Sequence, residues 1–135
     1  MAYINWGDSM SVGVASIDEQ HKNLVGIINE LYDQMMLGKD NEALGHIFNR
    51  IIDYAITHFK YEEELFAKTN YPLSRNHADE HTAFVKRIVE KQARFKSGEV
   101  VLSIEVIDFL EDWLSAHVLG LDKKYTAHFI AYGIR

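Results

Sequence analysis

Apolar residues recur at alternating steps of three and four in four stretches of the sequence, which is the spacing of one face of an α-helix. Proline occurs once, at Pro72, so it interrupts none of these stretches. They cover roughly residues 16–37, 41–69, 74–97 and 103–125. We therefore predict an all-α protein with four helices.

Residues that favour helix ends separate the four predicted helices. The capping-box pattern Ser16-Ile17-Asp18-Glu19 opens the first helix, and Gly38 offers a cap at its end. The other ends are marked by Asp40 or Asn41, Asn70-Tyr71-Pro72, Ser74, Ser97-Gly98 and Ser103. Connections this short place consecutive helices antiparallel, which predicts an up-down-up-down four-helix bundle. We expect one domain over residues 1–135, with residues 1–15 as an N-terminal arm and Trp6 as a plug.

The composition restricts both the location and the chemistry of the protein. No run approaches the roughly 20 apolar residues of a membrane-spanning helix. The N-terminus lacks the features of a secretory signal, so we expect a cytoplasmic protein. The net charge of −6 disfavours nucleic acid as a partner. Because the chain has no cysteine, any metal must bind to nitrogen and oxygen ligands.

Polar residues interrupt the apolar faces of all four predicted helices. They are His21 on the first helix, His58 and Glu62 on the second, His77 and His81 on the third, and His117 on the fourth. A step of four keeps His58 with Glu62, and His77 with His81, on one helix face. Since the helices alternate in direction, all six side chains are expected to meet at one level of the bundle.

A bound metal is the simplest way to stabilise this group of side chains. A lone histidine on an apolar face is usually a core residue that bonds a backbone carbonyl. Burying five of them with a carboxylate would cost several kcal/mol for each poorly matched group. A domain with about 5–15 kcal/mol of stability cannot carry that cost, so we predict a metal site.

The remaining histidines and nearby acids are interpreted as parts of the surface. His46 and His128 lie off the apolar faces and are expected to be ordinary surface residues. Glu63 and Glu64 are expected to face solvent or the side chains of Lys60 and Lys68. Asp18 is expected to interact with the dipole at the start of the first helix, with a possible role in orienting a metal ligand.

The order and spacing of the inward histidines resemble the hemerythrin family, specifically its bacterial branch. The motifs are a single His21, then His58-x-x-x-Glu62, His77-x-x-x-His81 and His117-x-x-x-x-Asp122. Short segments around these motifs also match the family, namely Asn5-Trp6, Val12-Gly13-Val14, Asp18-Glu19-Gln20-His21, Tyr71-Pro72 and Asp122-Lys123-Lys124-Tyr125. The resemblance runs from about Asn5 to Tyr125, and myohemerythrin itself is an up-down-up-down bundle.

The resemblance implies a centre of two iron ions. One iron would be bound by His77, His81 and His117, and the other by His21 and His58. Glu62 and Asp122 would bridge the two irons together with an oxo or hydroxo ion. In a regular helix, five residues turn Asp122 about 140° away from His117, so we predict a π-bulge between them.

The same resemblance implies reversible binding of dioxygen, for oxygen storage, transport or delivery. These ligands leave one coordination position open, on the iron with two histidines. The family's oxygen-pocket positions correspond to Leu24, Trp113, Leu114, Val118 and Leu121, which would exclude water from the site. All five would also serve as ordinary core residues, and the two interpretations are compatible.

Three other functions are alternatives, and the sequence disfavours the first of them. A ferritin-like di-iron oxidase needs paired Glu-x-x-His motifs, and no histidine here has a glutamate three residues before it. A metal-free bundle could use its histidines to respond to pH. The di-iron site could also serve oxygen or nitric oxide sensing, iron handling or a weak peroxidase activity. We expect a binding protein rather than an enzyme.

Overall fold

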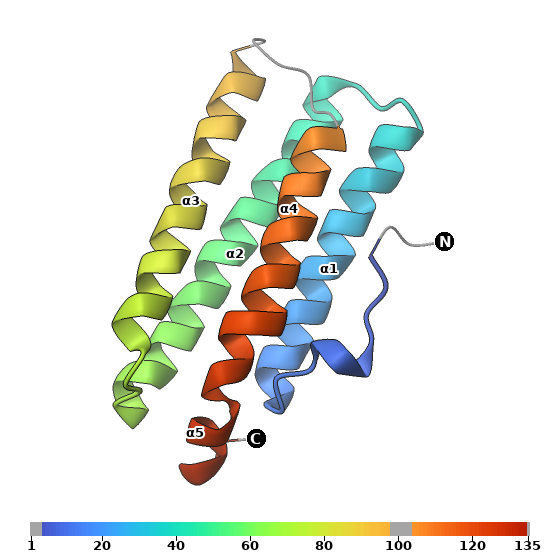
Figure 1. The fold of residues 1–135 in the computed structure, drawn as a ribbon. Coiled ribbons are helices and arrows are strands. Elements are labelled where there is room, and N and C mark those ends of the chain that lie inside the picture. Colours follow the sequence, from blue (N-terminus) through green and yellow to red (C-terminus); the bar gives the residue numbers. More distant parts are fainter. Residues whose placement is uncertain (1–3, 98–103, 135) are drawn as a thin grey trace.

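A computed structural model describes residues 4–97 and 104–134, and every regular element in these ranges is helical (Figure 1). The long helices are α1 (Ala15–Met36), α2 (Asn41–Thr69), α3 (Ser74–Lys96) and α4 (Ile104–Ala116). Short turns are η1 (Asp8–Met10), η2 (His117–Leu121) and η3 (Asp122–Tyr125), and α5 (Thr126–Ala131) follows. The prediction of an all-α protein is confirmed. Gly98 and Ser103, where two helix ends were expected, lie outside the described residues.

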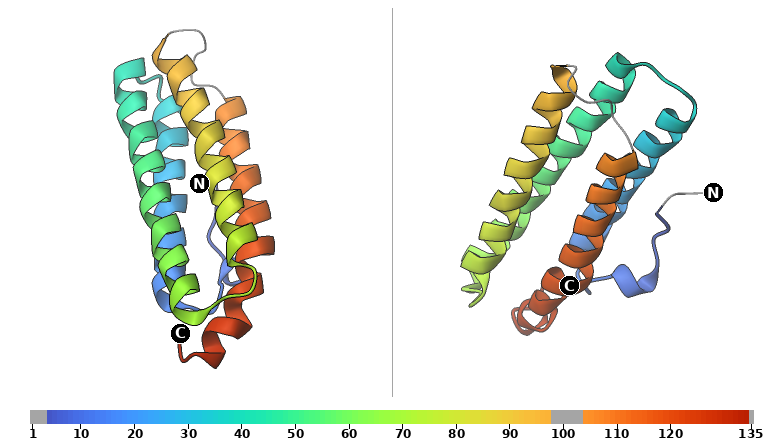
Figure 2. Two further views of the ribbon diagram at one scale, coloured as in Figure 1. Left: turned by 90° about the vertical axis from the view of Figure 1, so that its left-hand side faces the viewer. Right: turned by 45° about the horizontal axis from the view of Figure 1, so that its top comes forward.

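The four long helices run side by side in alternating directions, as the two views of Figure 2 show. Helix α2 packs against both α1 and α3, and α1 also contacts α4. The buried residues include Ile17, Ile28 and Leu31 of α1, Phe48 and Ile51 of α2, Ile88 of α3, and Ile107 and Leu110 of α4. No helix in the described part of the chain combines the length and apolar character of a membrane span.

The second helix begins and ends at the predicted signals. The carboxylate of Asp40 accepts a hydrogen bond from the backbone N–H of Ala43 at 2.9 Å, which is the bond of an N-cap. Asn70 adopts the left-handed conformation that ends the helix, with φ 51°. Gly38 ends α1 in the same way, with φ 75°. These residue choices fix two of the bundle's turns.

The predicted capping box at Ser16 is wrong, because α1 begins at Ala15 without a side-chain cap. The Ser16 hydroxyl instead lies 2.7 Å from the hydroxyl of Tyr61 on α2. The carboxylate of Asp18 accepts bonds from the Val12 backbone N–H, at 2.8 Å, and from the Ser11 hydroxyl. Asp18 therefore ties the N-terminal arm to α1.

The arm makes contacts at three places along the bundle. Ile4 exchanges two hydrogen bonds of 2.7 Å with the Asn29 side chain of α1. Trp6 is partly buried against the core, with the Lys22 ammonium 5.6 Å from its ring. The carbonyl of Val12 accepts a bond from the hydroxyl of Thr126. The arm thus connects α1 with the C-terminal segment.

The chain after α4 forms the predicted π-helical turn and then a part that the sequence pattern did not place. Residues 117–121 form the π turn η2, and the chain continues through η3 into α5. Phe129 of α5 is fully buried. His128 was expected at the surface, but its ring is partly buried, and Nε2 donates to the Thr69 carbonyl at 2.8 Å. This bond ties α5 to the end of α2.

Candidate metal centre

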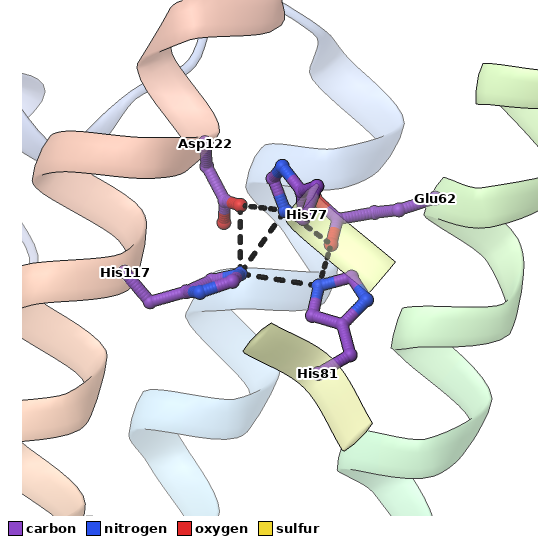
Figure 3. Close-up of side chains that lie close together, drawn as sticks. All are labelled: Glu62, His77, His81, His117 and Asp122. Atoms are coloured by element: carbon purple, nitrogen blue, oxygen red, sulfur yellow. Dashed lines mark hydrogen bonds and ion pairs between the residues drawn. The ribbon is translucent and has the colours of Figure 1, made fainter. Parts of the chain in front are cut away.

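Seven residues predicted as metal ligands lie together at one end of the bundle. They are His21 on α1, His58 and Glu62 on α2, His77 and His81 on α3, His117 at the start of η2 and Asp122 at the start of η3. All seven are at most 5 % exposed. Figure 3 shows five of these side chains, which converge from three directions. Their helices place them near the beginning of α1 and α3 and near the end of α2 and α4.

The ligand atoms form two clusters that share both carboxylates. One cluster contains Glu62, His77, His81, His117 and Asp122. The other contains His21, His58, Glu62 and Asp122. Within each cluster, the nitrogen and oxygen atoms all lie within 4.8 Å of one another. The arrangement could therefore hold two ions side by side, with one ligand fewer in the cluster of two histidines.

Asp122 faces both clusters because of the π turn. Its Oδ1 lies 2.7 Å from Nε2 of His77 and 3.0 Å from Nε2 of His117. Its Oδ2 lies 3.2 Å from Nε2 of His21, on the other side. The five-residue turn adds the extra residue that brings Asp122 back to the face of His117. The two oxygens are thus placed to bridge two ions.

Glu62 occupies a second position between the clusters. Its Oε1 lies 3.4 Å from Nε2 of His58 and 3.2 Å from Nε2 of His81. Its Oε2 accepts a hydrogen bond of 2.6 Å from the Tyr125 hydroxyl. Oε1 of Glu62 therefore faces the ligand atoms of both clusters, while Oε2 is held by the hydroxyl of Tyr125.

The ligand atoms fit metal ions because their lone pairs point toward one another. Too few hydrogen atoms lie between them for every lone pair to accept a hydrogen bond. Oε1 of Glu62 and both carboxylate oxygens of Asp122 are buried and have no hydrogen-bond partner. The nearby Nε2 atoms of neutral histidines are acceptors when Nδ1 carries the hydrogen. Buried oxygen and nitrogen lone pairs facing one another are costly unless a cation lies between them. Imidazole and carboxylate ligands suit first-row transition metals such as iron.

The charges of the cluster also favour cation binding. Burial lowers the pKa of His58 to about 4 and that of His81 to about 3, so both rings are neutral near pH 7. Burial opposes ionisation of Asp122, but the rings of His117, His21 and His77, whose Nε2 atoms lie within 3.2 Å of its oxygens, hold its pKa well below the usual value. Burial and the charge of Asp122 raise the pKa of Glu62. A bound cation would offset that repulsion between the carboxylates.

Three further residues support the ligands, and the sequence pattern did not assign them to the site. The side-chain oxygen of Gln20 lies 2.6 Å from Nδ1 of His58. Oε2 of Glu63 lies 3.2 Å from Nδ1 of His81, although the Glu63 side chain is 42 % exposed. Glu63 thus faces solvent in part, as expected, and also contacts a ligand of the cluster. The third residue is Tyr125, whose hydroxyl bonds Glu62. In the sequence it matched the family only within the segment Asp122-Lys123-Lys124-Tyr125.

The predicted pocket residues are either buried in the core or lie beside His117. Leu24, Leu114 and Val118 are at most 3 % exposed. Trp113 stacks on the ring of His117, with centroids 4.6 Å apart and an angle of 16°. Trp113 and Leu121 also line a pocket of about 340 Å³ that includes His117. His46 is exposed and lies outside both clusters.

Comparisons with known proteins agree with this site and fold. The family model of the hemerythrin HHE cation binding domain matches residues 12–128. The chain is 36 % identical to a bacteriohemerythrin of Pseudomonas aeruginosa, over 93 % of this chain and 80 % of that protein. It is 32 % identical to a bacteriohemerythrin of Methylococcus capsulatus, over 93 % of this chain and 95 % of that one.

The comparison extends to solved structures. The model superimposes on the crystal structure of a wild-type hemerythrin with a TM-score of 0.89 and 30 % identity. The match covers 93 % of this chain and 97 % of that one. The family-model match, the curated relatives and the shared fold together show that this chain belongs to the hemerythrin family.

Proposed function

We propose that this protein binds dioxygen reversibly at a pair of iron ions, for oxygen storage, transport or delivery. One observation carries the proposal: two buried ligand clusters share two carboxylates, and one cluster has a ligand fewer than the other. The shared carboxylates would hold two ions close together. The smaller cluster, around His21 and His58, would leave a position open for dioxygen.

Iron is the metal that best combines this ligand set with oxygen binding. Five imidazoles and two carboxylates suit iron, and the chain offers no thiolate. When bound, an iron pair with an oxo or hydroxo bridge supplies the two electrons that dioxygen takes up and returns. The ring nitrogens of the histidines would hold the ions, and the Tyr125 hydroxyl donates a hydrogen bond that holds the Glu62 carboxylate in place.

The apolar residues around the site would keep the binding reversible. Leu24, Leu114 and Val118 are buried in the core and lie within one helical turn of His21 or His117 along the chain, so they would keep water away from the ligands. Without water, no external acid reaches the bound ligand, and irreversible oxidation of the centre is slowed. These side chains therefore favour release of dioxygen as dioxygen.

We propose ligand binding rather than catalysis as the main activity. Five imidazoles and two carboxylates give the ions fewer anionic ligands than a carboxylate-rich oxidase site provides. Fewer anionic ligands stabilise strongly oxidised metal ions less well, so turnover of a substrate is disfavoured. Oxygen sensing by the same site is the second candidate, because it needs the same ligands and the same open position.

An optical spectrum of the iron-loaded protein tests the proposal. The protein is reduced without air, exposed to oxygen and then returned to an oxygen-free atmosphere. We expect a colourless reduced form that gains visible absorption with oxygen and loses it when oxygen is removed. A protein that holds about two irons but never changes colour with oxygen would contradict the carrier function.

A further inference from the structure

The two halves of the centre have different outer hydrogen-bond partners. His58, in the half with two histidines, faces the neutral amide oxygen of Gln20 at 2.6 Å. His81, in the half with three histidines, faces the carboxylate of Glu63 at 3.2 Å. Both partners lie on the side of the ring away from the ligand clusters, at Nδ1. The outer partners of His58 and His81 therefore differ by one negative charge.

These partners fix which nitrogen of each ring faces the centre. An amide oxygen and a carboxylate oxygen can only accept, so Nδ1 of both His58 and His81 carries the hydrogen and donates it. The lone pair then lies on Nε2, which points into the clusters at 3.4 Å and 3.2 Å from Oε1 of Glu62. Gln20 and Glu63 thus orient their histidines equally well as metal ligands.

Gln20 and Glu63 differ in how much they increase the ability of the histidine ring to donate electron density from Nε2 to a metal ion. A hydrogen bond to a carboxylate is charge-assisted and pulls the Nδ1 proton away from the ring, which makes Nε2 more basic. A hydrogen bond to a neutral amide does this much less. His58 should therefore stabilise an oxidised ion less than it would with a carboxylate partner.

We propose that Gln20 is a positioning residue that tunes oxygen release at the proposed iron pair. Its neutral oxygen orients His58 without adding negative charge to the half that has the open position. Glu63 adds that charge to the opposite half, where the three histidines lie. The distribution of charge keeps the centre able to give up electrons to dioxygen and to take them back. This inference rests on the proposed oxygen-binding function.

The test exchanges the charges without changing the shapes. Gln20→Glu places a carboxylate against His58, and Glu63→Gln removes one from His81. We expect Gln20→Glu to slow oxygen dissociation about tenfold and to lower the midpoint potential of the iron centre. We expect Glu63→Gln to change both quantities in the opposite direction. Oxygen dissociation is followed by stopped flow, and the midpoint potential by optical titration with redox dyes.

Two control variants separate this effect from the general field of an added or removed charge. Asn23→Asp adds a negative charge to the exposed face of α1, and Glu64→Gln removes one from the exposed face of α2. Both should leave the oxygen dissociation rate and the midpoint potential as in the unmodified protein. Glu63→Gln is expected to shift the dissociation rate and the midpoint potential in the opposite direction. The inference therefore stays testable if Gln20→Glu fails to fold.

The possible outcomes distinguish this inference from the function on which it rests. If the unmodified protein shows no reversible oxygen spectrum, the proposed function fails. If it does show one, and Gln20→Glu and Glu63→Gln leave the dissociation rate and potential unchanged, the tuning role is overturned. Equal shifts in the test variants and in their matched controls would overturn it as well.

Discussion

The chemistry of single residues decides how firmly this centre can hold metal. Each of the five histidines offers a buried ring nitrogen to a cluster, and the two carboxylates face both clusters. Metal binding requires these groups without their protons, and burial already keeps His58 and His81 neutral near pH 7. Removing one ring should therefore cost far more metal affinity than removing a histidine outside the clusters.

His77→Ala and His117→Ala are expected to lower iron content from about two ions per chain to below one. Both rings belong to the cluster of five ligands, and each deletion leaves carboxylate charge uncompensated. His46→Ala and His128→Ala serve as controls and should keep about two irons. Elemental analysis of folded, purified protein measures the difference. Equal iron loss in all four variants would refute the ligand assignment.

The sequence predicted the inward histidines but not the residues that hold them. The ligands could be found because apolar periodicity reveals any polar residue on a core face, as at His58 and His81. Gln20 and Glu63 each lie beside a ligand in sequence but bond a histidine on another helix. That contact depends on the distance between two helices, which periodicity within one helix does not contain. Gln20 was matched only within the segment Asp18-Glu19-Gln20-His21, and nothing in the local sequence pointed to Glu63.

Among the elements, the π turn η2 and the N-terminal arm have the largest effect on the site. The turn could be predicted because His117 and Asp122 are five residues apart, a spacing that a regular helix cannot bring to one face. The arm's path could not be predicted, since it depends on contacts with distant residues such as Thr126. The misassigned cap at Ser16 has the same cause: Asp18 binds the arm.

Gly13→Ala tests the path of the arm. Gly13 has φ 76°, and an added Cβ would lie 3.0 Å from the side chain of Thr126. An alanine in this left-handed conformation should lower the free energy of unfolding by about 1–2 kcal/mol. Chemical denaturation of the metal-free protein measures the change.

The matched control for that variant is Gly26→Ala. Gly26 lies within α1, and an added Cβ there meets no atom within 4 Å. Alanine should raise the free energy of unfolding by about 0.5–1 kcal/mol, because it loses less conformational freedom on helix formation. If both variants were stabilised, the close contact between the arm and the C-terminal segment would be wrong.

Across the whole molecule, the site lies at the end of the bundle that α5 packs against. Helix α5 lies at the end of α2, where His128 bonds Thr69, and the arm runs beside α1 and bonds Thr126 of α5 (Figure 1). The opposite end carries exposed apolar residues at Met36 and Leu37 and none of the ligands. One chain thus carries both ligand clusters, so the proposed iron pair predicts a fixed ratio of oxygen to iron.

Measuring how much oxygen the protein takes up tests the central claim most directly. The reduced, iron-loaded protein is titrated with dissolved oxygen, and bound oxygen is then released under vacuum and quantified. The account predicts one dioxygen for every two irons, nearly all of it recovered as dioxygen. Uptake of one dioxygen per iron, no uptake, or uptake without recovery would contradict reversible binding at a paired centre.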